Sequence, residues 1–98
     1  MDKKQAITLA KQYKELVSAR LPVIALYLYG SYNKGTQTDD SDIDIAVIVS
    51  HRADNYFDDT PLLWTLRRQV SSLIEPVLLT EDENDELYRI VKATGMQI

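Results

Sequence analysis

The stretch VIALYLYGSYNKGTQTDDSDIDIAVIVS, residues 23–50, decides the fold of this chain. It opens with Val23–Tyr29, a run rich in the β-branched and aromatic residues that favour strands. A second run, 42–50, begins with strict alternation of polar and apolar residues and then stays apolar, which also predicts a strand. The glycines and polar residues between the two runs predict a short helical turn over 31–36 and a loop over 37–41.

Outside this stretch, the sequence predicts three longer helices and one more strand. Apolar residues recur at spacings of three and four over 2–20, with Asp2 as a plausible N-cap. Thr60-Pro61 is typical of a helix start, and the apolar face that follows it runs to Ile74. The other predicted segments are a polar loop over 51–59, a strand over 75–80 and a helix over 85–94. Alternation of helices and strands predicts an α/β fold, a small mixed sheet of about three strands with helices packed on it, in a single domain over residues 1–98.

Composition narrows the class of function. The net charge is −4 and the pI is about 4.8, so direct binding of polymeric nucleic acid is not expected, because basic residues dominate that binding. The chain has no cysteine, which excludes disulfide scaffolds and cysteine-based zinc sites. No apolar run approaches the ~18 residues of a membrane helix, and we expect no membrane association and a cytoplasmic location.

Two aspartates at the start of the second strand form the first chemical feature. Asp42 and Asp44 are two residues apart, so both side chains point to the same face of a strand. Neighbouring carboxylates repel each other unless a cation lies between them. Mg²⁺ is commonly held by one or two carboxylates together with substrate phosphates. A solvated strand end is the alternative, because Asp-x-Asp is also common there.

The second feature is Gly30-Ser31, at the junction of a strand and a helical turn. Glycine lets the backbone approach an anion closely, and the free N–H groups of a helix start point towards it. The Ser31 hydroxyl could donate to a phosphate, and Lys34 could reach one as a point charge. Each residue alone also fits an ordinary turn. Together with the aspartate pair on the next strand, they favour a site for a nucleotide and Mg²⁺.

These residues resemble a known signature. Gly30-Ser31 followed by Ser41-Asp42-Ile43-Asp44 is similar to the motif of the DNA polymerase β-like nucleotidyltransferase superfamily. Lys34-Gly35-Thr36 resembles the basic-Gly-Thr segment that often follows the Gly-Ser in that family. The whole chain looks most like the minimal nucleotidyltransferases of prokaryotes. The resemblance implies the polymerase β-like fold, Mg²⁺ as cofactor, ATP as nucleotide donor, and nucleotide contacts from Gly30, Ser31, Lys34 and Ser41.

The resemblance also implies a third carboxylate on an adjacent strand, next to Asp42 and Asp44. Glu75 is the best candidate, since Ile74-Glu75-Pro76 looks like a segment of some minimal members, although the usual residue is an aspartate inside the strand. If Glu75 faces the site, it is catalytic: it deprotonates the attacking hydroxyl or completes a metal site with the two aspartates. The alternative is a surface glutamate at the end of a helix.

The resemblance finally implies a function. Similar proteins transfer AMP from ATP to a hydroxyl, a tyrosine of an all-helical HEPN-type toxin, and so act as antitoxins. This predicts a helical partner chain, or a homodimer when the chain is isolated. The alternative is a catalytically inactive nucleotide-binding or partner-binding module that neutralises its partner by complex formation. An antibiotic-modifying nucleotidyltransferase would need a further domain for the drug and is disfavoured by the length of 98 residues.

Overall fold

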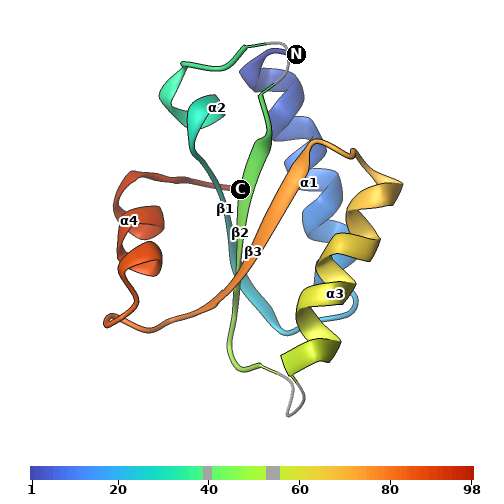
Figure 1. The fold of residues 1–98 in the computed structure, drawn as a ribbon, viewed down its shortest axis with the longest axis vertical. Coiled ribbons are helices and arrows are strands. Elements are labelled where there is room, and N and C mark those ends of the chain that lie inside the picture. The colour runs from blue at the N-terminus through green and yellow to red at the C-terminus, as the bar shows by residue number, and fades with distance from the viewer. Residues whose placement is uncertain (39–40, 53–55) are drawn as a thin grey trace.

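The computed structural model describes residues 1–38, 41–52 and 56–98, and the side chains of 56–58 are also outside the described part. Its strands are β1 (Val23–Tyr29), β2 (Ile43–Val49), β3 (Ile74–Thr80) and β4 (Met96–Gln97). Its helices are α1 (Lys3–Ser18), α2 (Ser31–Lys34), α3 (Tyr56–Leu66), the 3₁₀ helix η1 (Arg67–Gln69) and α4 (Glu86–Thr94). Within the described residues the strands form one four-stranded sheet in the order β3-β2-β1-β4. Figure 1 labels the first three strands of the chain, β1, β2 and β3.

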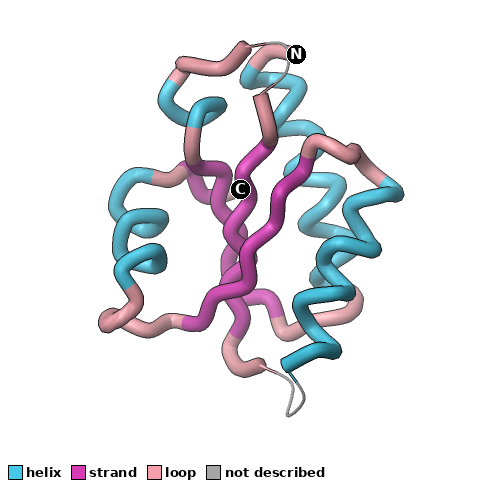
Figure 2. The backbone as a smooth tube through the Cα atoms, in the orientation of Figure 1, coloured by secondary structure: helices cyan, strands magenta, loops and turns pink. Residues whose placement is uncertain are grey.

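The sheet has helices on both faces (Figure 2). α1 and α3 cover one face, and the core there includes Tyr13, Leu28, Ile45, Leu63 and Ile74. α4 lies against the opposite face, where a smaller core is formed by Ala46, Ile48, Leu79, Tyr88 and Val91. Alternate residues of each strand point to opposite faces, so the apolar run of β2 supplies both cores. Burial on both sides explains why this strand is apolar beyond its first residues.

The directions of the strands agree with the expected mixed sheet. β1 and β2 are antiparallel, whereas β2 and β3 are parallel. The prediction of an α/β fold with a small mixed sheet is confirmed. The two-residue strand β4, paired with β1, was not predicted, because a segment this short carries no periodic pattern of its own.

The start of α1 follows its local sequence closely. Asp2 is the N-cap, accepting from the Gln5 N–H at 2.8 Å while the Gln5 side chain accepts from the Asp2 N–H at 3.0 Å. This reciprocal capping box satisfies two N–H groups that have no partner inside the helix. The helix ends at Ser18, two residues before the predicted limit. None of the helices in the described part of the chain is both long and apolar enough to span a membrane.

The prediction for the second of the three longer helices was wrong at both ends. α3 begins at Tyr56, so residues 56–59 are helical rather than a loop, and Pro61 lies inside the helix rather than at its first position. Residues 53–55 of the predicted loop lie outside the described part. The helix ends at Leu66 and Ile74 already belongs to β3, so the apolar residues from Val70 to Ile74 are not a helical face. α3 continues ahead of Thr60, so the local capping signal there does not set the start of the helix.

Candidate active site

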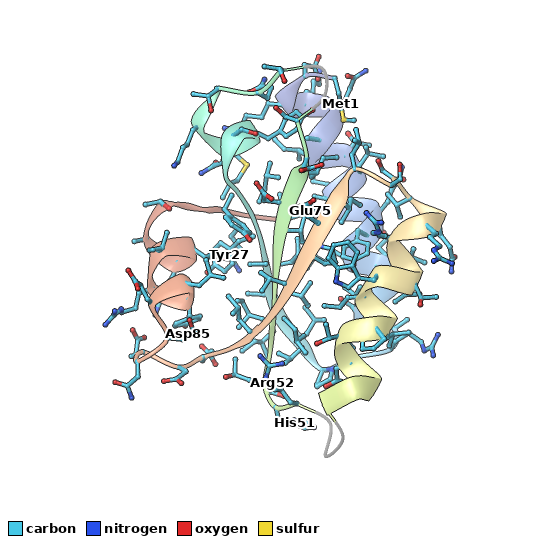
Figure 3. The ribbon with its side chains drawn as sticks, in the orientation of Figure 1. Met1, Tyr27, His51, Arg52, Glu75 and Asp85 are labelled. Atoms are coloured by element: carbon cyan, nitrogen blue, oxygen red, sulfur yellow. The ribbon has the colours of Figure 1, made fainter. Side chains whose placement is uncertain are left out.

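A row of polar side chains crosses the sheet at the start of β2. Asp44 of β2 pairs with Tyr29 of β1 and with Glu75 of β3. Residues directly opposite on neighbouring strands point to the same face, which here is the face covered by α4. Asp44 and Tyr29 are half-buried, and Glu75 is exposed. Glu75 lies towards the end of the sheet nearer to α2, and Arg52 lies at the opposite end (Figure 3).

Asp42 lies two residues before Asp44, immediately ahead of β2, and is exposed. The Ile43 N–H donates to the Leu73 carbonyl oxygen at 2.8 Å, which ties the start of β2 to the start of β3. This bond and the parallel register bring the predicted carboxylates Asp42, Asp44 and Glu75 together at one end of the sheet. Glu75 is therefore not a glutamate at a helix end, as its alternative interpretation proposed, but a residue inside a strand.

The carboxylates perturb one another electrostatically. Burial and the charge of Asp42 raise the pKa of Asp44. Slight desolvation, the charge of Asp42 with a hydrogen bond to it, and the charge of Asp44 all raise the pKa of Glu75, while Arg67 opposes this. Burial and the charges of Asp44 and Glu75 raise the pKa of Tyr29. Ionisation is thus disfavoured at several neighbouring groups, and a bound cation would reverse that preference.

The turn after β1 brings its backbone against this row. Gly30 has φ = 73°, and a Cβ added to it would collide with the carboxylate of Asp44. Only glycine fits here, because the conformation is left-handed and the space is already filled. The Tyr32 side chain is fully buried and anchors α2 in the core. The turn that was predicted to bind phosphate therefore lies directly beside the acidic row, and its position is fixed.

The other predicted nucleotide-binding residues surround this turn. Ser31 is the first residue of α2, with Gly30 as N-cap, and is half-buried. Lys34 is exposed at the end of α2, close to Ser31 along the chain. The hydroxyl oxygen of Ser41, the residue just before Asp42, accepts from the Thr38 N–H at 2.8 Å.

Two residues at the site were not singled out by the sequence analysis. Tyr29 could have been found, because it immediately precedes Gly30. The alternation of side chains along a strand also determines the face of the sheet to which Tyr29 points. Arg67 could not, because the predicted helix extended past it to Ile74 and hid the turn in which it lies. Its guanidinium Nη1 donates to the carbonyl oxygens of Ser72 at 2.7 Å and Ile74 at 3.1 Å.

The donor set fits a hard divalent cation in its chemistry. Asp42, Asp44 and Glu75 offer only carboxylate oxygens, the ligands that Mg²⁺ prefers. In the conformations seen, no three His, Asp or Glu side chains of the described residues are grouped closely enough to hold a metal ion by themselves. The three residues meet across neighbouring strands with exposed or half-buried side chains, so rotation about side-chain bonds can bring their oxygens together.

Comparison with known proteins assigns the family. The model of the family described as polymerase beta, nucleotidyltransferase matches residues 11–96 of the chain. This chain belongs to that nucleotidyltransferase family. The resemblance inferred from the sequence motif is confirmed, and the matched range includes Gly30, Asp42, Asp44 and Glu75.

Individual relatives of this nucleotidyltransferase agree with the assignment of the family. The protein adenylyltransferase MntA of Shewanella oneidensis is 37% identical over 62 residues, covering 62% of this chain and 41% of that protein. The chain thus spans about two fifths of the length of this curated relative. A candidate nucleotidyltransferase from Sulfolobus solfataricus shares the fold with a TM-score of 0.68 at 21% identity, over 98% of this chain and 79% of that chain. A toxin–antitoxin crystal structure with AMP-PNP is 26% identical, with a TM-score of 0.53, over 99% of this chain and 72% of that chain.

Proposed function

We propose that this nucleotidyltransferase is a Mg²⁺-dependent protein adenylyltransferase that moves AMP from ATP to a tyrosine hydroxyl of a HEPN-type toxin, and so acts as its antitoxin. One observation carries the proposal: the acidic residues Asp42, Asp44 and Glu75 meet on one sheet face beside the Gly30 turn. A triphosphate bound with Mg²⁺ needs acidic ligands for the metal and a close backbone for the phosphates, and this arrangement supplies both.

The relatives support the choice of nucleotide and acceptor. The curated relative is a protein adenylyltransferase, and one structural relative is a toxin–antitoxin complex with AMP-PNP, an analogue of ATP. Their sequence identities to this chain are 37% and 26%, respectively. The described residues leave large apolar side chains exposed at Ile24, Trp64 and Ile90, which a partner chain could cover.

Each side chain has a proposed task in the transfer. The backbone at Gly30-Ser31, the Ser31 hydroxyl and Lys34 bind the phosphates of ATP. The acceptor hydroxyl oxygen attacks the α-phosphorus of ATP. The bond between the α-phosphorus and the oxygen that bridges it to the β-phosphorus breaks, and pyrophosphate leaves. Glu75 accepts the proton of the acceptor hydroxyl. Asp42 and Asp44, with Glu75 available as a further ligand, would hold Mg²⁺, and the ion would supply positive charge against the triphosphate.

A direct transfer assay tests this proposal. The protein is incubated with ATP, MgCl₂ and a HEPN-type toxin chain, the one encoded by a neighbouring gene where there is one, and mass spectrometry then follows the toxin chain. We expect its mass to increase by one AMP on a tyrosine, and EDTA to prevent the modification. Binding of ATP and of the partner without any modification would instead support the alternative, a catalytically inactive module that acts by complex formation. Absence of both binding and transfer would contradict both functions.

The two glycines with a positive φ, Gly30 and Gly35, provide a test of the phosphate turn. Gly30 and Gly35 have nearly the same φ, 73° and 76°, but an added Cβ meets Asp44 only at Gly30 and nothing within 4 Å at Gly35. Alanine at Gly35, which is in the αL conformation, should lower the free energy of unfolding by about 1–2 kcal/mol through backbone strain. Alanine at Gly30 should lower it by more, because its φ of 73° and ψ of −148° lie in a region that only glycine adopts readily and the added Cβ also meets Asp44. Only Gly30→Ala should also weaken ATP binding, by roughly tenfold or more, because it displaces the carboxylate of Asp44.

Thermal unfolding and isothermal titration with MgATP measure the two effects separately. If Gly35→Ala weakens ATP binding as strongly as Gly30→Ala, the loss comes from general strain in the turn. Contact between Gly30 and the acidic row would then not be the cause.

A further inference from the structure

Arg67 makes the most specific side-chain contacts near the acidic row. It opens η1, directly after α3. Its Nη1 donates to the carbonyl oxygens of Ser72 and Ile74, at 2.7 Å and 3.1 Å. The Ile74 carbonyl belongs to the peptide group that joins Ile74 to Glu75. The guanidinium is therefore bonded to the peptide group from which the third carboxylate of the site extends.

The position of this guanidinium is itself fixed. Its central carbon lies 4.5 Å from the centroid of the Trp64 ring, the distance of a cation–π contact. Trp64 is one turn earlier along the chain, in α3, and is 39% exposed. The backbone carbonyl of Arg67 also accepts from the N–H groups of Val70 at 3.0 Å and Ser71 at 2.8 Å, so the turn closes on the same residue. Arg67 is thus held by its ring contact and by its own turn.

The start of β3 needs such support. β3 is an edge strand, bonded to β2 on one side only. Beyond Glu75 comes Pro76, which has no N–H to donate. On the inner side, Leu73 accepts from the N–H of Ile43. On the outer side, within the described part of the chain, Arg67 supplies donors where a further strand would otherwise supply them.

We propose that Arg67 is a positioning residue for Glu75: through its bonds to the Ser72 and Ile74 carbonyls it fixes the peptide group that carries the third carboxylate of the transfer site. This inference rests on the proposed function, because it assigns Glu75 a task in transfer. Arg67 acts through Glu75 and touches neither nucleotide nor acceptor. Lysine can replace it only in part, since an ammonium group can donate to carbonyls but lacks the planar group that stacks on the Trp64 ring.

A double-mutant cycle tests this role. We expect Arg67→Ala to lower kcat by roughly tenfold with ATP affinity nearly unchanged, because misplacing a reacting group costs turnover more than binding. Arg67→Lys, which keeps a charged donor but not the planar group over Trp64, should lose less turnover than Arg67→Ala. In a Glu75→Gln background, Arg67→Ala should cause no further loss, because the group it positions is already absent. Arg68→Ala, which removes the exposed arginine next in the chain, is the matched control and should leave kcat unchanged.

Two outcomes would overturn the proposal. One is an unchanged kcat in Arg67→Ala. The other is a fall in kcat from Arg67→Ala that is equally large in the wild-type and the Glu75→Gln backgrounds, because a purely structural residue behaves in this way. Thermal unfolding of every variant ensures that the assays compare folded proteins, and Arg67→Lys and Arg67→Gln replace Arg67→Ala if it does not fold.

Amide hydrogen exchange gives a readout that does not depend on activity. The Glu75 N–H shares its peptide group with the Ile74 carbonyl, and we expect it to exchange roughly tenfold faster in Arg67→Ala than in the wild type, because a bond to a charged donor is lost. The amides of β1, away from this edge, should keep their rates. If the wild type transfers no AMP but Glu75 exchange responds as expected, the proposed function fails while positioning by Arg67 stands. An unchanged exchange rate at Glu75 would refute the positioning role.

Discussion

Replacing Asp42 and Asp44 together by asparagine should abolish AMP transfer while the fold is retained. Both side chains are polar, exposed or half-buried, and outside the two apolar cores, so their removal leaves the packing intact. Asparagine keeps the shape but removes the charges that would hold Mg²⁺ against the triphosphate. Charge stabilisation by a metal contributes several kcal/mol, so we expect transfer to fall by roughly 10³-fold or more. Quantitative mass spectrometry of the modified partner measures this loss.

The same variant separates catalysis from stability. Burial and the charge of Asp42 raise the pKa of Asp44, so the charged form of Asp44 is disfavoured in the folded, metal-free protein. The double variant should therefore be at least as stable as the wild type without metal, and its Tm should no longer respond to Mg²⁺ with ATP. Glu86→Gln, which neutralises an exposed acid in the first turn of α4, is the control and should keep full activity. Wild-type transfer by the double variant would exclude these aspartates from the site.

Those parts of the fold that have a strong local pattern could be predicted from the sequence. The bounds of β1 follow from its run of strand-favouring residues between Pro22 and Gly30. The N-cap at Asp2 follows from capping chemistry. In both cases the residues that form the element also stabilise it, without help from distant parts of the chain.

The rest depended on contacts between distant segments. Residues 56–59 belong to α3 although Thr60-Pro61 is a local start signal, and β4 is defined by its pairing with β1. Neither feature leaves a periodic signal in the local sequence. Arg67 bonds to two carbonyls at a turn that the sequence analysis took for helix, so its role was also hidden.

The candidate site lies between these two cases. That Asp42 and Asp44 share one face follows from strand alternation alone. That Glu75 joins them required β3 to lie beside β2, parallel and in the register that pairs Asp44 with Glu75. A shift of one residue in the register of β3 would have placed Glu75 on the face covered by α1 and α3. The identification of Glu75 as the third carboxylate therefore depended on tertiary structure.

Replacing Glu75 by glutamine should lower turnover by about 10²–10⁴-fold, the usual contribution of a general base, while ATP affinity stays nearly unchanged. Glutamine keeps the size of the side chain but cannot accept the proton of the acceptor hydroxyl. The proposal assigns the metal mainly to Asp42 and Asp44, so the nucleotide should still bind. Glu75→Asp keeps the charge on a shorter side chain and should retain more turnover than Glu75→Gln. Glu81→Gln, at an exposed acid just beyond the opposite end of β3, is the control that changes net charge equally.

Measuring kcat and the Kd for MgATP side by side distinguishes the two proposed roles of Glu75. A fall in kcat alone identifies the base, because binding then needs only the two aspartates and the Gly30 turn. A parallel loss of ATP affinity would instead identify Glu75 as a metal ligand, as expected for Asp44→Asn. Wild-type kcat in Glu75→Gln would show that the carboxylate has neither role, despite its register opposite Asp44. The proton of the acceptor would then have to leave through another group, and Tyr29, on the other side of Asp44, would be the next residue to replace.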